Sequence, residues 1–143
     1  MFELRHIALI SKGDISILRE FYKVIIKPYS VIEKMEEGEI LDSIIGIKNA
    51  KIVTCKLFSK NINIEIIKYL NPIAKVNQFN IPAFTGLNHI AFTVDNFEEA
   101  KKLILNSGGS CIKNKVPKIT GGNVKFAQYF KDPENNFLEI VEI

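Results

Sequence analysis

The chain has 143 residues, of which 47% are hydrophobic, and a formal net charge of +3. This length suits one domain spanning 1–143 with a substantial core. We expect no membrane partner, because no apolar run reaches the roughly 18 residues of a membrane span. The first ten residues do not resemble a signal peptide, so we expect a cytoplasmic protein. The lysines are scattered among glutamates rather than gathered in a basic stripe, so we expect no nucleic-acid partner.

The first half predicts a strand, a helix and three further strands. An apolar, β-rich run at 3–10 precedes Gly13-Asp14, which is a helix-start signal, and ISILREFYKVI then has apolar residues at helical spacing. The three later strands are expected at 29–35, 50–58 and 62–69. Module one therefore covers 1–70, and residues 71–85, with two prolines and little periodicity, form the expected linker.

The second half, 86–143, repeats this order. A strand at 87–94 leads to Asp95-Asn96, with Glu99 placed as a capping-box partner, and the helix stops at Gly108-Gly109. Strands are expected at 110–115, 123–130 and 137–143, with Asn135 in the positive-φ position of the last hairpin. The fold class is thus α+β, with two tandem βαβββ modules.

The two cysteines, Cys55 and Cys111, lie far apart and form no CxxC pair. They indicate neither a disulfide framework nor a thiolate zinc site, and both are interpreted as buried or semi-buried thiols.

Two short motifs recur between the halves. Arg5-His6-Ile7-Ala8-Leu9 matches Asn88-His89-Ile90-Ala91-Phe92 at an offset of 89 − 6 = 83, and Asn63-Ile64-Glu65-Ile66-Ile67 is echoed by Phe137-Leu138-Glu139-Ile140-Val141. His6 and His89 are the only histidines, and each glutamate stands between apolar neighbours that would pack beneath a helix. Taken alone, each of these four residues could be an ordinary core, surface or strand residue. Together, two imidazoles and two carboxylates at equivalent positions predict a site for one divalent ion of Zn, Ni, Co, Fe or Mn, bound by His6, Glu65, His89 and Glu139.

The sequence resembles the vicinal-oxygen-chelate superfamily, which includes glyoxalases, bleomycin-resistance proteins and extradiol dioxygenases. The most specific stretches are GLNHIAFTVDNFEEAKKLILNSGG at 86–109 and GGNVKFAQYFKDPENNFLEIVEI at 121–143, and RHIALI and NIEIIKYLNP match in register in the first half. This resemblance covers essentially the whole chain. It implies modules that curl a mixed sheet around a metal, and a homodimer as the commonest assembly.

The ligand set favours one activity within that superfamily. Glyoxalase I proteins use His or Gln, Glu, His and Glu, whereas related epimerases often carry Gln at the position of Glu65. The resemblance therefore implies a metal-dependent lyase or isomerase of the lactoylglutathione lyase class, acting on a small hemithioacetal or α-hydroxycarbonyl substrate through an enediolate. Glu139 is the expected catalytic base, with Glu65 second. The alternatives are a methylmalonyl-CoA-type epimerase, an extradiol dioxygenase and a non-catalytic protein that binds a small molecule such as an antibiotic.

Two further features have open interpretations. Lys113, Lys115 and Lys118 lie beside the loop at 120–123 and could meet an anionic part of the substrate, although a solvated basic edge explains them as well. Tyr69 is on the same strand face as Glu65, where it could line the site or pack at its rim.

Overall fold

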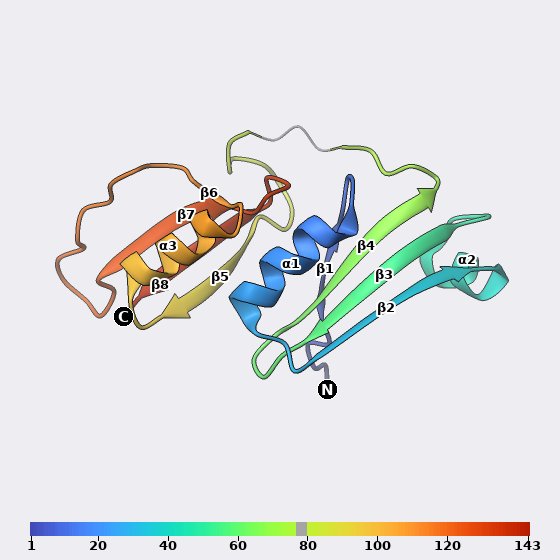
Figure 1. Ribbon diagram of the computed structural model, residues 1–143, viewed down its shortest axis with the longest axis horizontal. Helices are drawn as coiled ribbons and strands as arrows, with labels where there is room; N and C mark the ends of the chain where they lie inside the picture. The colour runs from blue at the N-terminus through green and yellow to red at the C-terminus, as the bar shows by residue number, and fades with distance from the viewer. Residues whose placement is uncertain (77–79) are drawn as a thin grey trace. The chain divides into compact units, whose positions relative to one another are not determined.

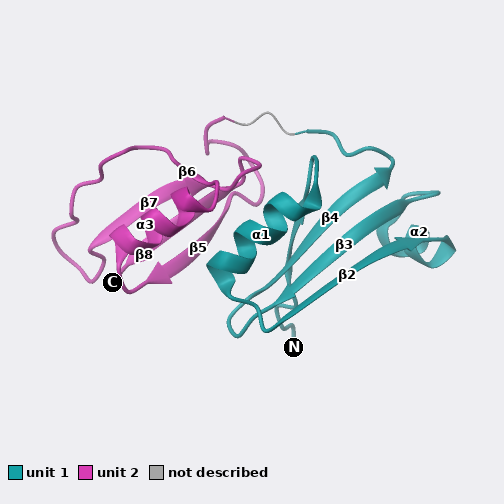
Figure 2. Ribbon diagram, in the orientation of Figure 1, with its two compact units in different colours: residues 1–77 teal, residues 78–143 magenta. Residues whose placement is uncertain are grey.

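A computed structural model describes residues 1–76 and 80–143. The chain divides into two compact units, 1–77 and 78–143 (Figure 2). Each unit holds one four-stranded mixed sheet with a long helix on it, so the predicted α+β class with two tandem modules is confirmed. The expected linker, 71–85, includes residues 77–79, which lie outside the described residues. None of the described helices is both long and apolar enough to cross a membrane.

The described residues of the first unit form four strands and two helices, with the strands in the order β1-β4-β3-β2 (Figure 1). β1 is parallel to β4, and the other neighbours are antiparallel. The first and last strands of the unit are therefore side by side. The elements are β1 (Ile7–Ile10), α1 (Ile15–Ile26), β2 (Ser30–Glu37), α2 (Glu39–Ile45), β3 (Lys51–Phe58) and β4 (Asn63–Asn71).

The second unit has the same topology, with strand order β5-β8-β7-β6. β5 is parallel to β8, again placing the first and last strands together, and the remaining pairs are antiparallel. The elements are β5 (His89–Val94), α3 (Phe97–Asn106), β6 (Ser110–Cys111), β7 (Phe126–Lys131) and β8 (Phe137–Glu142).

The core of the first unit lies between α1 and one face of its sheet. Asp14 starts the helix by accepting a hydrogen bond from the Ser16 amide at 2.9 Å, which also lowers the pKa of the Asp14 carboxyl. The helix ends at Lys27, whose left-handed backbone precedes a proline. Apolar residues at helical spacing are buried against alternate residues of β3 and β4: Ile15, Leu18, Phe21, Tyr22, Cys55, Leu57, Ile64 and Ile66.

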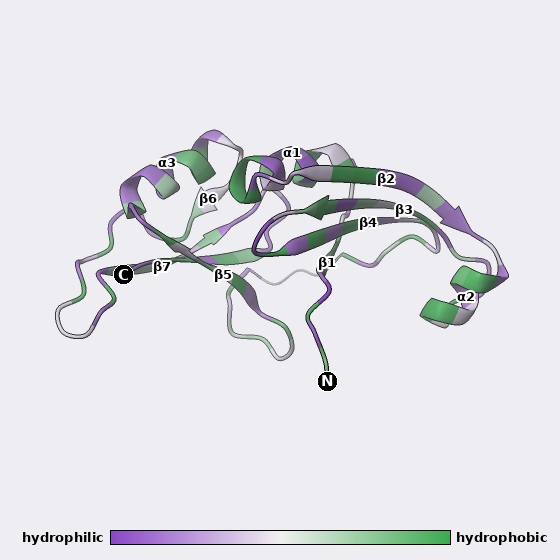
Figure 3. Ribbon diagram, turned by 90° about the horizontal axis from the view of Figure 1, so that it is seen from below, coloured by the Kyte–Doolittle hydropathy of each residue, from purple (hydrophilic) through white to green (hydrophobic). Residues whose placement is uncertain are grey.

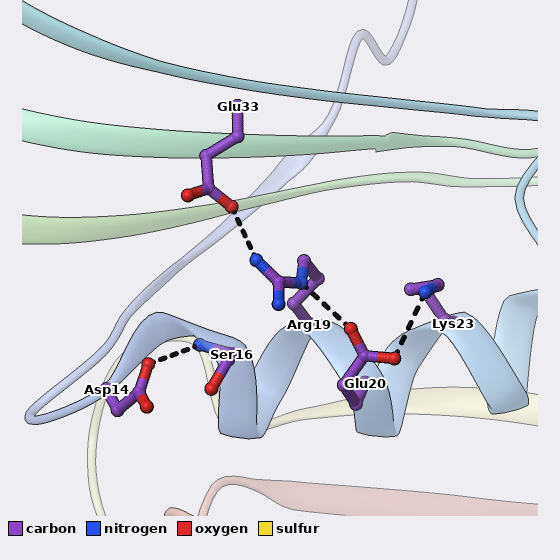
Figure 4. Close-up of polar contacts among 6 residues, drawn as sticks. All are labelled: Asp14, Ser16, Arg19, Glu20, Lys23 and Glu33. Carbon is purple, nitrogen blue, oxygen red and sulfur yellow. Dashed lines mark hydrogen bonds and ion pairs between the residues drawn. The ribbon is translucent and has the colours of Figure 1, made fainter.

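Polar contacts join the outer side of α1 to the edge strand β2 (Figure 4). Arg19 donates from Nη1 to Glu33 at 2.8 Å and from Nε to Glu20 at 2.9 Å. Lys23 donates to the other oxygen of Glu20 at 3.0 Å. These groups are partly exposed, so they orient the helix on the sheet more than they stabilise the fold.

The short helix α2 was not predicted from sequence. It lies on the opposite side of the sheet from α1 (Figure 3), where Leu41 packs against Ala50, Ile52 and the side chain of Tyr69. Asp42 holds the following turn by accepting hydrogen bonds from the Asn49 and Ala50 amides at 2.6 and 2.9 Å. Tyr69 is therefore a packing residue of this cluster.

The helix signals of the second half are confirmed. Asn96 caps α3 by accepting a hydrogen bond from the Glu99 amide at 3.1 Å. The helix ends in a Schellman motif, with the Gly109 amide bonded to the Ile104 carbonyl at 3.0 Å and Gly108 at a φ of 93°. Asn135 has a φ of 71°, as predicted for the last hairpin.

Two predicted strands are much shorter than expected. β1 begins at Ile7 rather than at residue 3, because its only partner, β4, begins at Asn63 and the ladder starts at the Ile7–Ile64 pair. β6 ends at Cys111 rather than at residue 115, because its antiparallel ladder with β7 covers only the Ser110–Lys131 and Cys111–Phe130 pairs, although β7 itself extends back to Phe126. His6 therefore lies just before a strand, whereas His89 lies at the start of one.

Candidate functional site

His6 and Glu65 are brought together by the parallel pairing of β1 with β4. Ala8 is the cross-strand partner of Glu65, and His6 lies two residues earlier on the same face. Nε2 of His6 is 3.0 Å from Oε2 of Glu65, and the Glu65 side chain is only 11% exposed. Its neighbours Ile64 and Ile66 point into the core, so the carboxylate lies on the face opposite α1. The predicted first pair is thus in direct contact.

A lysine that sequence reasoning missed completes this group. Lys56 is the cross-strand partner of Glu65 in the β3–β4 hairpin, and its Nζ lies 3.4 Å from Oε1 of Glu65. One carboxylate oxygen therefore faces an imidazole and the other faces an ammonium group. The register of the hairpin could have pointed to Lys56, because the short connection between β3 and β4 places position 56 opposite position 65.

His89 and Glu139 form the corresponding pair in the second unit. Ala91 is the cross-strand partner of Glu139, just as Ala8 is of Glu65, and His89 again lies two residues before the alanine. Nε2 of His89 is 3.2 Å from Oε2 of Glu139. The Glu139 side chain is 26% exposed, so this carboxylate is more accessible than that of Glu65.

The surroundings of His89 orient its ring. Oδ1 of Asn88 lies 2.9 Å from Nδ1 of His89, so a proton on Nδ1 can be donated to the amide oxygen, and Nε2 is then left as the donor atom for a metal. The Tyr129 ring lies 4.7 Å from the imidazole, centroid to centroid. Tyr129 is also the cross-strand partner of Glu139, the position that Lys56 occupies opposite Glu65.

Within each pair, the two donor atoms have the chemistry and the spacing of two ligands of one metal ion. Two ligands that each lie about 2.0–2.1 Å from one tetrahedral ion are about 3.3 Å apart, close to the 3.0 and 3.2 Å separations of the paired donor atoms. Each pair offers one nitrogen and one oxygen. Among residues 1–76 and 80–143, no group of three or more His, Cys, Asp or Glu side chains is placed to hold a metal ion.

Solved structures share this architecture. A glyoxalase family protein from Bacillus cereus matches with a TM-score of 0.84 at 14% sequence identity, covering 99% of this chain and 94% of that one. The chain has the glyoxalase fold. The predicted resemblance is therefore confirmed at the level of fold. No protein-family model matches the sequence, and a search of curated proteins finds no significant match.

Two further structural neighbours have descriptions that state a function. The fosfomycin resistance protein FosX from Listeria monocytogenes, solved with Mn(II) and a sulfate ion, matches with a TM-score of 0.57 at 18% identity, covering all of this chain and 93% of that one. A variant of glyoxalase I from Zea mays matches with a TM-score of 0.56 at 16% identity, covering 95% of this chain but 43% of that one. These likenesses establish a shared fold.

The other residues singled out from the sequence are three lysines and two cysteines. Lys113, Lys115 and Lys118 are exposed on the long connection between β6 and β7. Cys55 is buried in the core, where burial raises the pKa of its thiol to about 11, and Cys111 is partly buried. Both thiols are free, as expected, and the protonated Cys55 thiol is a poor nucleophile.

Proposed function

We propose that His6, Glu65, His89 and Glu139 bind one divalent metal ion. The observation that supports this most strongly is the recurrence of the same His–Glu contact in both units, in the same strand register. The pair recurs although the residue opposite each carboxylate differs, Lys56 facing Glu65 and Tyr129 facing Glu139. Two donors do not complete a metal site, so the proposal requires both pairs to bind the same ion.

The proposed activity is that of a lyase or isomerase of the glyoxalase I type, which moves a proton between neighbouring carbons of a hemithioacetal or α-hydroxycarbonyl. A divalent metal, when bound, supplies positive charge where negative charge develops on the substrate oxygens. The chain must supply a base that takes the proton from one carbon and returns it to the next. A carboxylate on an accessible sheet face meets this requirement.

Glu139 is the proposed base and Glu65 the proposed permanent ligand. Glu65 is held from two sides, by His6 and Lys56, and its side chain is 11% exposed. Within the described part of the chain, Glu139 has His89 as its ion-pair partner, and it is 26% exposed. A carboxylate that must leave one partner to accept a proton does so more readily when one contact holds it than when two do. The structure thus favours Glu139 for the moving role.

Metal analysis with a substrate panel tests this function. Purified protein is expected to contain or take up about one divalent ion per chain, and the His6→Ala/His89→Ala double variant is expected to take up far less. The panel comprises methylglyoxal–thiol adducts, CoA thioesters and catechols, with fosfomycin added because FosX shares the fold. Equal metal content in both proteins would refute the site. Metal uptake without turnover of any panel member would instead favour a protein that binds a small molecule.

Assembly and location remain separate predictions. A homodimer in the cytoplasm is the proposed setting for this activity. Sedimentation velocity at micromolar protein concentration is expected to give the mass of two chains, and a single-chain mass would refute the dimer.

A further inference from the structure

The two His–Glu pairs differ in the residue that faces the carboxylate from the neighbouring antiparallel strand. Opposite Glu65 this residue is Lys56, and opposite Glu139 it is Tyr129. The lysine contacts the carboxylate, with Nζ 3.4 Å from Oε1, while the tyrosine ring packs on His89. The pseudo-symmetric site therefore has one half with an added positive charge.

This charge acts on one particular oxygen. His6 faces Oε2 of Glu65 and Lys56 faces Oε1, so the two oxygens have different partners. Lys56 is 33% exposed and Glu65 11%, so water screens the pair only in part. An ion that approached Oε1 would have to displace the ammonium group, whereas an ion beside His6 meets Oε2 directly.

We propose that Lys56 is a positioning residue that restricts Glu65 to binding the metal through the single oxygen Oε2. This inference rests on the proposed function. A carboxylate can bind a metal through one oxygen or both, and two-oxygen binding by Glu65 would fill a coordination position that the substrate needs. Lys56 keeps that position open, at the cost of some metal affinity, because a cation close to the ligand repels the ion.

Cobalt(II) serves as the probe, because its visible absorption weakens as its coordination number increases. Lys56→Met removes the charge and keeps an unbranched apolar side chain that is one heavy atom shorter. This variant is expected to bind Co(II) about three- to tenfold more tightly than wild type and to show a weaker visible band. Lys56→Arg, which keeps the charge opposite Oε1, is expected to restore the wild-type spectrum.

The matched control is Lys34→Met. Lys34 lies on the same sheet face, where it pairs with Glu36 at 3.0 Å, so its loss changes the local charge equally without touching Glu65. Its Co(II) spectrum and affinity are expected to equal those of wild type. If Lys56→Met behaves like Lys34→Met, the role of Lys56 is refuted while the metal site stands. If wild type binds no Co(II), both the inference and the proposed metal site fail.

Discussion

Asn88 holds the imidazole of His89 through its side-chain oxygen, 2.9 Å from Nδ1, while the other ring nitrogen faces Glu139. The equivalent position in the first unit, 88 − 83 = 5, is Arg5, which cannot accept such a bond. There, the Asn63 side chain binds the Arg5 carbonyl instead, at 2.9 Å. The two histidines are therefore equivalent in register and different in how their rings are oriented.

The first prediction concerns this orientation. Asn88→Ala is expected to weaken metal binding about tenfold or more, because outer partners of a metal-binding histidine fix its ring and tautomer. Competition with a chromophoric chelator measures the affinity. Asn80→Ala is the control, because Asn80 is exposed and its contact with Lys131 uses the main-chain carbonyl. Unchanged affinity in Asn88→Ala would show that the hydrogen bond does not matter for the site.

The second prediction separates the two glutamates. Glu139→Gln is expected to lose catalysis more completely than metal, because an amide oxygen can bind a metal but cannot accept the substrate proton as a carboxylate does. Glu65→Gln is expected to keep appreciable turnover. The measurement is turnover of both variants at matched metal occupancy, on the substrate that the panel identifies. A Glu139→Gln protein as active as wild type would overturn the assignment of the base.

The third prediction concerns the thiols. Burial raises the pKa of Cys55 to about 11, so its reactive thiolate is scarce in the folded protein near neutral pH. Iodoacetamide at pH 8 is therefore expected to label the partly buried Cys111 and to spare Cys55, with both labelled in urea. Peptide mass analysis gives the two rates. Equal labelling of both cysteines in the native protein would contradict the buried position.

The same raised pKa has a consequence for stability. The folded state keeps the Cys55 proton at pH values where the unfolded chain, with a thiol pKa of about 8.5, has lost it. Cys55 therefore makes its full contribution to the free energy of unfolding below the pKa of the unfolded thiol. This contribution is lost as the pH rises toward 11. Between pH 8 and pH 11, the free energy of unfolding of Cys55→Ala, measured in urea, is expected to fall less than that of wild type. Equal falls in the two proteins would argue against a stabilising role for the Cys55 proton.

The fourth prediction concerns the hairpin that precedes Glu139. Asp132 is 2% exposed and accepts hydrogen bonds from the Glu134 and Asn136 amides, both at 2.9 Å, and from the Asn136 side chain at 2.7 Å. Asp132→Ala is expected to lower the free energy of unfolding by about 2–4 kcal/mol, measured in urea. The exposed Asp95→Ala is expected to cost less than about 1 kcal/mol, and similar losses in the two variants would contradict this role for Asp132.

The repeat explains why so much of the site could be predicted. His6 and His89 recur with similar apolar neighbours, and a strand's alternation fixes which side chains share a face, so the four residues could be singled out from the pattern, and the structure brings each histidine to one glutamate. Lys56 has no counterpart in the second half, where Tyr129 stands, so the repeat gave no hint of it. It follows only from hairpin register, which sequence patterns define poorly.

The helix α2 was missed, and the strands β1 and β6 were predicted too long, for a different reason. α2 buries only Leu41 among its own residues, and Asp42 secures the turn after it through the amides of Asn49 and Ala50, which lie beyond the end of the helix. Short helices of this kind depend on tertiary contacts rather than on intrinsic propensity. The ends of β1 and β6 likewise depend on how far each strand stays paired with its neighbour, which a local apolar run does not reveal.

The parallel pairing of first and last strands ties the candidate site to the folding of each unit. The paired residues are 65 − 6 = 59 positions apart in the first unit and 139 − 89 = 50 in the second. Closing such long loops is entropically costly and contributes to slow folding, whereas the β3–β4 hairpin closes locally. Each His–Glu pair therefore forms only after its own unit has closed this long loop, whereas the contact of Lys56 with Glu65 needs only the hairpin.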